Sequence, residues 1–94
     1  MTEKEETYGL MFTLLRRLRR QRLPRLLAIK TRLDHGDRVA ADDIHYLQES
    51  FSEALRTQPL FDRHPELSDI SLRVIGLYRE ISLTALRNES SQRM

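Results

Sequence analysis

Apolar residues recur every three or four positions along three stretches of the chain, and each stretch predicts an amphipathic helix. The stretches cover residues 7–34, 41–57 and 65–88. The first carries one polar side chain, Arg22, whose methylene stem can cover apolar surface while its guanidinium reaches water. The other members of that first stripe are Tyr8, Met11, Leu15, Leu18, Leu26, Ile29 and Leu33.

Pro24 interrupts the first stretch. Proline has no amide hydrogen, clashes with the preceding turn and costs about 3 kcal/mol inside a helix. Either one helix kinks here, or a new helix starts with Pro24 at its first position. Leu23 would be a poor N-cap, and the apolar stripe continues across the proline. We therefore expect one long kinked helix, with four helices in all as the alternative.

Helix ends are marked by a few residues. Gly36 can adopt the left-handed conformation with which many helices end. Asp42 and Asp43 suit the first turn of the second helix, where they complement its dipole. Pro59 predicts that this helix stops, because the residue before a proline avoids helical angles. Pro65 suits the first position of the third helix.

Short connections at 35–40 and 58–64 favour antiparallel neighbours. The sequence thus predicts an all-α fold, a three-helix antiparallel bundle with a long Pro-kinked first helix. We expect one domain over residues 1–94, with flexible termini at 1–6 and 89–94. The predicted core comprises Met11, Leu15, Leu18, Leu26, Ile44, Leu47, Phe51, Leu55, Ile70, Val74, Leu77 and Ile81.

The third stretch is apolar on two sides. Its first stripe joins the core, and a second lies almost opposite on the helical wheel. A chain this small has few elements to cover both sides, so the surplus apolar surface predicts self-association, with a homodimer expected. The candidate residues are Leu72, Ile75, Leu83 and Leu86 on the second stripe, or Leu14, Leu23 and Leu27, which lie off the main stripe of the first helix.

Charge is distributed unevenly behind a formal net charge of +2. Residues 8–33 carry eight basic side chains and no acidic one, whereas residues 34–66 carry eight acidic and three basic ones. A nucleic-acid-binding module usually keeps its basic field uncancelled, so the acidic segment argues against that function. The sequence leaves open whether the two segments meet within one chain or between two.

Four arginines, Arg16, Arg17, Arg19 and Arg20, fall on the side of the first helix away from its apolar stripe. They can be a solvated face, bind an acidic protein or neutralise phosphates of a nucleic acid. The run has no aromatic residue on which a base could stack. Membrane binding is the least favoured reading, because the chain has no tryptophan and the core needs the apolar side of this helix.

Catalytic and metal-binding patterns are not found in the sequence. It has no cysteine and no Gly-rich phosphate loop. His45 and Glu49 are four residues apart, as in ordinary surface pairs on helices. Asp42 and Asp43 diverge by about 100° on a helix, so they cannot act side by side. We expect no catalytic, cofactor-binding or metal-binding residues and no small-molecule substrate.

Residues 60–70, LFDRHPELSDI, combine several polar side chains around Pro65. They can form a polar recognition loop, since loops on rigid scaffolds often carry function. A helix-entry motif is favoured, because Pro65 sets the first dihedral angle while Leu60 and Phe61 can attach the connection to the core.

The expected function is that of a non-enzymatic protein–protein interaction module, an adaptor or regulatory protein that acts through its helix faces. Nucleic-acid binding by the arginine-rich face is the alternative. A cytoplasmic location is expected, because the acidic N-terminus does not resemble a secretory signal and no apolar run could span a bilayer. The candidate partner-binding residues are Leu14, Arg16, Arg17, Arg19, Arg20, Leu23, Leu27, Leu72, Ile75 and Leu83.

Overall fold

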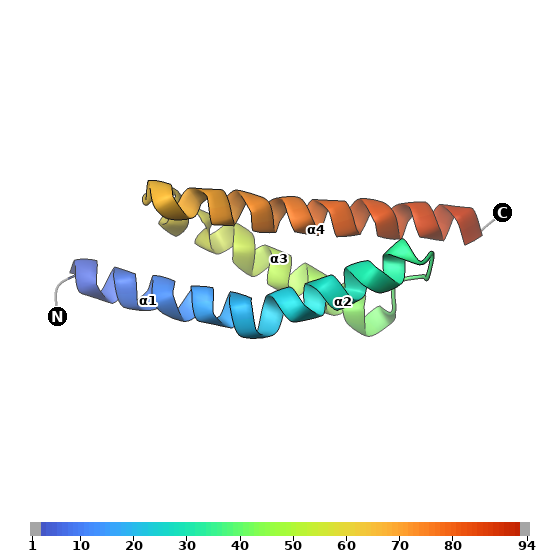
Figure 1. Ribbon diagram of the computed structural model, residues 1–94, viewed down its shortest axis with the longest axis horizontal. Helices are drawn as coiled ribbons and strands as arrows, with labels where there is room; N and C mark the ends of the chain where they lie inside the picture. Colours follow the sequence, from blue (N-terminus) through green and yellow to red (C-terminus); the bar gives the residue numbers. More distant parts are fainter. Residues whose placement is uncertain (1–2, 93–94) are drawn as a thin grey trace.

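The computed structural model describes residues 3–92 and contains three rod-like helical units. In the first, α1 (Glu3–Arg17), the π-helical turn η1 (Leu18–Arg22) and α2 (Leu23–Asp34) follow one another without a break. The second is α3 (Ala41–Asp62) and the third is α4 (Pro65–Gln92). The predicted all-α, three-helix bundle is confirmed (Figure 1).

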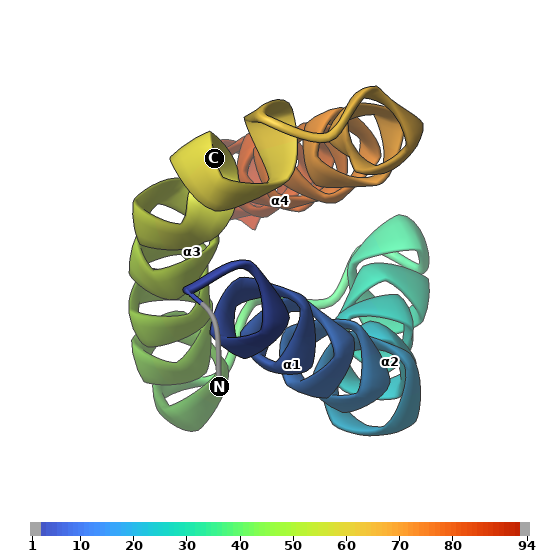
Figure 2. The ribbon, with the colours of Figure 1, turned by 90° about the vertical axis from the view of Figure 1, so that its left-hand side faces the viewer.

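The three units run up, down and up, so that neighbours in sequence are antiparallel (Figure 1). Seen end-on, they occupy the corners of a triangle, with α1 and α2 sharing one corner (Figure 2). The bundle is elongated, with extents of 58 × 20 × 17 Å. α4 packs mainly against α3 and then against α2, whereas α1 makes few close contacts with the other two units.

Pro24 bends the first unit through the π-turn η1. The Leu23 amide donates to the Leu18 carbonyl, five residues back, and the wider turn keeps the chain helical where the proline has no amide hydrogen. Leu18, Arg22 and Leu26 are spaced four and four, which is eight residues over two turns, whereas a regular helix needs about 7.2. The π-turn absorbs the extra residue and keeps the three on the inner side. The predicted kink is confirmed, and the alternative of a helix break is not.

The connection at residues 35–40 is built as the sequence predicts. Gly36 has φ of 92°, and its amide donates to the Leu33 carbonyl at 2.9 Å, while the Asp37 amide donates to the Arg32 carbonyl at 3.2 Å. These bonds satisfy the last carbonyls of α2. The Asn88 side-chain amide of α4 donates to the carbonyls of Leu33 and Asp37, both at 2.8 Å. α4 therefore fixes the end of α2.

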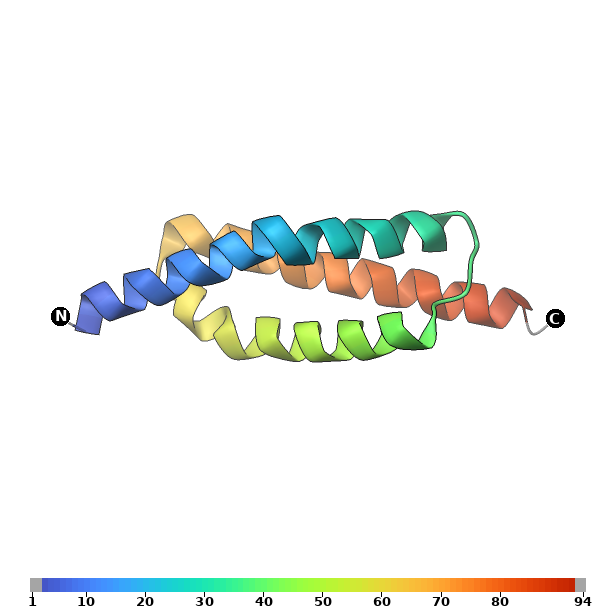
Figure 3. The same cartoon turned by 90° about the horizontal axis from the view of Figure 1, so that it is seen from below.

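The prediction that the second helix ends at residue 57 was wrong. α3 continues to Asp62 with Pro59 inside it. Phe61, four residues beyond the predicted end, is buried in the core. Burial of such a side chain contributes about 1.5–3 kcal/mol, which offsets the cost of an internal proline. Figure 3 shows the last turns of α3, coloured yellow, bending towards α4.

The outer helices extend further than the sequence predicts, because α1 begins at Glu3 and α4 ends at Gln92. Helix therefore covers residues 3–6 and 89–92 of the segments expected to be flexible, and residues 1, 2, 93 and 94 lie outside those described. Near the end of α4 the Arg38 Nε donates to Glu89 Oε2 at 2.9 Å. This contact raises the pKa of Arg38 and ties α4 to the 35–40 connection.

The core is centred on α2 and the middle of α4. Its fully buried cluster comprises Leu26, Ile29, Leu33, Tyr78 and Ile81, and Met11 and Phe61 are also buried. Of the twelve residues predicted for the core, nine are buried or half-buried, namely Met11, Leu15, Leu18, Leu26, Leu47, Phe51, Val74, Leu77 and Ile81. The prediction was wrong for Ile44, Leu55 and Ile70, which are exposed.

The exposure of Ile44 and Leu55 follows from the rotation of α3 about its axis. Its inward side is centred on Ser50, which is 2% exposed, with Asp43 and Phe61 within about 20° of it on a helical wheel. Ile44 and Leu55 lie about 120–140° from Ser50. The helix thus turns polar side chains towards the first unit and leaves part of its apolar stripe outside. Ile70 lies at the edge of the bundle near α1, which makes few close contacts with α3 and α4.

Leu26→Ala is expected to lower the free energy of unfolding by about 2–5 kcal/mol, because it leaves a cavity in the densest part of the core. Leu27→Ala, the same change at the adjacent exposed position of α2, should change it by less than about 0.5 kcal/mol. Urea unfolding followed by circular dichroism measures both. Equal losses in the two variants would contradict this placement of the core.

Candidate interaction surfaces

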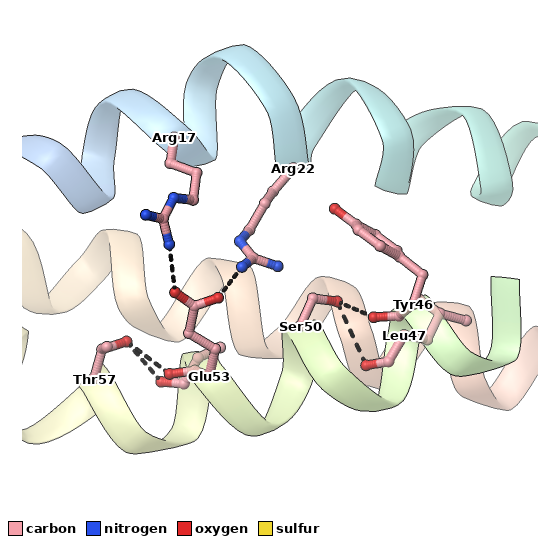
Figure 4. A network of polar contacts seen from close by, with 8 residues as sticks. Arg17, Arg22, Tyr46, Leu47, Ser50, Glu53 and Thr57 are labelled. Carbon is pink, nitrogen blue, oxygen red and sulfur yellow. Dashed lines mark hydrogen bonds and ion pairs between the residues drawn. The ribbon is translucent and has the colours of Figure 1, made fainter. Parts of the chain in front are cut away.

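The basic first unit meets the acidic side of α3 within one chain. Arg17 Nη1 lies 3.0 Å from Glu53 Oε1, and Arg22 Nη2 contacts the other carboxylate oxygen. Figure 4 shows both arginines reaching across from the first unit to the same carboxylate. The side chains of Arg22 and Glu53 are only 21% and 22% exposed. Glu53 therefore joins α3 to Arg17, the last residue of α1, and to Arg22, the last residue of η1.

Asp43, a second carboxylate of α3, contacts two basic residues of α2 in the same way. Asp43, buried in the first turn of α3, lies 3.8 Å from Arg25 and accepts a hydrogen bond from Arg32. The guanidinium of Arg25 also stacks over the Tyr46 ring, 3.8 Å from its centroid. The sequence assigned Asp43 to the helix dipole alone and missed its pairing with α2. The acidic and basic segments are thus matched inside the chain.

Lys30 links α2 to α4. Its ammonium group lies 2.7 Å from the Asp34 carboxylate and 3.5 Å from Glu80 of α4. The hydrogen bond that Lys30 donates to Asp34 is the main reason why the pKa of Lys30 is raised, and the charges of Asp34 and Glu80 add to it. Because both carboxylates are exposed, this contact orients α4 more than it stabilises it.

Three arginines of the first unit stay outside these contacts. Arg16, Arg19 and Arg20 are exposed and make no ion pair with any residue in the described part of the chain. They surround a shallow depression together with Leu15 and Phe12, and Phe12 is 67% exposed. We call Phe12, Arg16, Arg19 and Arg20 the basic face. Arg17, also a candidate partner-binding residue, is directed to Glu53 instead.

The three leucines off the main stripe do not form one surface. Leu14 lines a cavity between the first unit, α3 and α4, which is described below. Leu23 is half-buried in a groove where Ile70 and Leu77 of α4 lie. Leu27 is exposed on α2. Leu14 and Leu23 thus face the bundle, and only Leu27 is presented to solvent as the sequence suggested.

The second apolar stripe of α4 is on the outside of the bundle. Leu72, Leu83 and Leu86 are 58%, 51% and 65% exposed, and Ile75 is half-buried. We call these four residues the outer face of α4. It lies away from the basic face, so the chain presents two separate surfaces.

A cavity of about 60 Å³ lies between η1, α3 and α4, and its wall includes Leu18, Ala54, Val74 and Tyr78. Small-molecule pockets usually measure about 300–1,000 Å³, so this cavity suits a few waters instead. Tyr78 is only 1% exposed, and its hydroxyl has no hydrogen-bond partner among residues 3–92. Its ring stacks on Phe51 with centroids 5.2 Å apart.

Burial raises the pKa of the Tyr78 hydroxyl, and nearby Ser50 and Arg22 oppose this shift. Ser50 gives its own proton to the Tyr46 carbonyl at 2.7 Å (Figure 4). The phenol is therefore held neutral in a largely apolar wall. The sequence pattern missed this residue, although it lies on the same side of α4 as Val74 and Ile81.

The patterns considered for catalysis form ordinary surface structure. His45 Nε2 lies 3.1 Å from Glu49 Oε1, and both side chains are at least 70% exposed. Pro65 is the first residue of α4, and the His64 ring packs 5.3 Å from that of Tyr8. Among residues 3–92, no three His, Asp or Glu side chains are arranged to hold a metal ion, and no helix has the length and apolarity that a membrane span requires.

Comparison of the chain with protein families, curated proteins and solved structures found no match. The basic face and the outer face of α4 are therefore the features from which a function can be inferred.

Glu53→Gln is expected to lower the free energy of unfolding by about 1 kcal/mol, between the value of a surface ion pair and that of a buried one. The loss should shrink at high salt, because screening already weakens the wild-type contacts. Glu49→Gln removes the same charge from an exposed pair and should cost close to nothing. Urea titrations at low and high salt measure this, and equal costs at the two positions would contradict the role of Glu53.

Tyr78→Phe should leave the free energy of unfolding unchanged or raise it by up to about 1 kcal/mol, because the buried hydroxyl lacks a partner. The wild type should also lose stability above pH 10. The unfolded chain ionises its tyrosines near pH 10.0, while the folded pKa of Tyr78 is higher, so alkali favours unfolding.

The phenylalanine variant should lose less stability than the wild type between about pH 10 and 11. Thermal melts across this range provide the measurement. A marked loss at neutral pH would show that the hydroxyl has a partner, such as a water in the cavity.

Proposed function

We propose that this protein is a non-enzymatic protein–protein interaction module, an adaptor or regulatory protein that binds its partners through exposed helix faces. One observation carries the proposal: the fold leaves large apolar side chains exposed on the outward sides of two different units. Leu10 and Phe12 are exposed on α1, and Leu72, Leu83 and Leu86 on α4. Apolar patches of this kind mark interaction sites.

The partner proposed for the basic face is an acidic, amphipathic protein segment. Glu53 and Asp43 already neutralise their arginine neighbours, so Arg16, Arg19 and Arg20 are the positive charges left available along this part of the chain. Phe12 supplies a large apolar contact beside them. Aromatic and arginine side chains are the residues that most often dominate binding energy at protein interfaces.

The weak attachment of α1 supports this proposal. α1 makes few close contacts with α3 and α4, and it exposes three large side chains, Tyr8, Leu10 and Phe12. A helix that contributes little to the core can rearrange to fit a partner at small cost to the fold. We propose that such binding takes place in the cytoplasm.

Nucleic-acid binding is the second candidate, favoured by the same three unpaired arginines. They would neutralise phosphates, and binding would weaken steeply with salt. Phe12 separates an amphipathic protein segment from duplex DNA, because phosphate contacts with a duplex do not require it. A single-stranded nucleic acid could stack a base on Phe12, so direct binding measurements decide that case.

The experiment is affinity capture from nuclease-treated extract of the native cell, followed by fluorescence anisotropy with generic duplex DNA and single-stranded RNA. The variant Arg16→Ser/Arg20→Ser and the variant Phe12→Ala should both lose the captured protein. Arg56→Ser/Arg63→Ser is the matched control, because it removes two exposed arginines that make no ion pair in the described part of the chain.

Loss of the partner in the first two variants, retention in the control and flat anisotropy curves are expected. Salt-sensitive nucleic-acid binding that is lost in Arg16→Ser/Arg20→Ser would support the second candidate. Capture that is unchanged in all variants would contradict the assignment of the basic face.

A further inference from the structure

The outer face of α4 has features that contacts within the chain do not explain. Its leucines are more than half exposed, and with Ile75 they follow one side of the helix from Leu72 to Leu86, with Arg79 at the centre of the stripe. They lie opposite the side that contains Val74, Tyr78 and Ile81. The stripe therefore contributes little to the bundle.

Gly76 lies beside this stripe, in the interior of the 28-residue helix. Glycine there costs about 1 kcal/mol relative to alanine. A Cβ atom at this position would have no neighbour within 4 Å, and among the described residues Gly36 alone has a positive φ. Neither packing nor backbone conformation within the chain requires this glycine. Its missing side chain would let another helix approach closely.

Four charged residues follow one flank of the stripe in the order acid, base, acid, base: Asp69, Arg73, Glu80 and Arg87. On a helical wheel they lie about 60–100° from Leu72. Two helices related by a two-fold axis and running antiparallel bring the same flanks together in opposite order. Asp69 then faces Arg87 of the other helix, and Arg73 faces Glu80, whose carboxylate also lies 3.5 Å from Lys30 of its own chain. In a parallel two-fold pair the same flanks lie on opposite sides of the interface, so these four charges would have no such partners.

We propose that the outer face of α4 is covered by α4 of a second copy of this chain, antiparallel and centred between Leu77 and Tyr78. In this register Leu72 faces Leu83 of the second copy, and Gly76 makes room for the stem of Arg79. A shift by three residues would bring Arg79 against its own equivalent, and like charges disfavour it. The inference rests on the proposed function, since it names the occupant of one interaction face.

Light scattering after size-exclusion chromatography tests the assembly. The wild type should be a dimer at micromolar concentration, and Gly76→Leu should be a folded monomer, because the added side chain blocks the close approach. Gly9→Leu is the matched control, since Gly9 is a helical glycine of α1 with equally open surroundings, and it should remain dimeric. Circular dichroism confirms that each variant folds.

Charge reversal tests the register. Asp69→Arg and Arg87→Asp should each weaken the dimer about tenfold, because the contact between Asp69 and Arg87 occurs twice in every dimer. The double variant should regain most of the wild-type affinity. Within one chain these residues are about 27 Å apart along the helix, so only a contact between chains can produce this rescue.

Because the chain has no cysteine, disulfide trapping is free of background. A mixture of Leu72→Cys and Leu83→Cys chains should form a mixed disulfide in air, and neither alone should cross-link efficiently. A monomeric wild type, cross-linking of Leu72→Cys with itself, or failure of the double charge variant to recover would each overturn the proposal.

The self-association and the partner of the basic face can be refuted separately. A monomer whose basic face still captures its partner refutes only the self-association. A dimer that captures nothing refutes only the partner on the basic face.

Discussion

The structure depends on the contact between the arginine-rich first unit and the two carboxylates on the inward side of α3. Glu53 takes Arg17 and Arg22, and Asp43 takes Arg25 and Arg32. With these contacts, two carboxylates of a neighbouring helix offset half of the charge of four guanidinium groups that repel one another on the first unit. The contacts also account for the rotation of α3, because both carboxylates can point to the first unit only if Ser50 faces inward. The ion pairs and the burial of Phe61 on the same side of the helix together set the rotation of α3.

The π-turn has a complementary role. Arg22 interrupts an otherwise apolar stripe, and in a regular α-helix the four-and-four spacing of Leu18, Arg22 and Leu26 would drift away from the core. The extra residue in η1 prevents this drift and leaves Arg22 half-buried beside Glu53. Pro24 favours the wide turn, because it removes the amide hydrogen bond that would otherwise tighten it. Pro24 therefore favours the turn that places Arg22 beside Glu53.

Much of the fold could be predicted from the sequence, because helix type, helix number and the kink follow from local periodicity, Gly36 and Pro24. The spacing of four and four around Arg22 was a signal for the π-turn. The extension of α3 past Pro59 could not be predicted locally, since burial of Phe61 by residues distant in sequence offsets the proline. The exposure of Ile44 and Leu55 was missed because helical periodicity identifies the apolar side of a helix, and ion pairs to another helix turned that side outward.

The rotation of α3 also bears on the difference between the basic face and the outer face of α4. Phe51 stacks on Tyr78 and the two helices are antiparallel, so Leu55 lies about level with Val74 and Ile44 about level with Ala85. The apolar residues that α3 gives up to meet the arginines therefore border the outer face of α4, along the flank opposite its charged residues. Matching the charges inside the chain thus enlarges the apolar surface outside it. The apolar surface around the outer face of α4 gains area, while the basic face keeps only the arginines that α3 does not reach. The rotation of α3 therefore contributes to the different chemistry of the two faces.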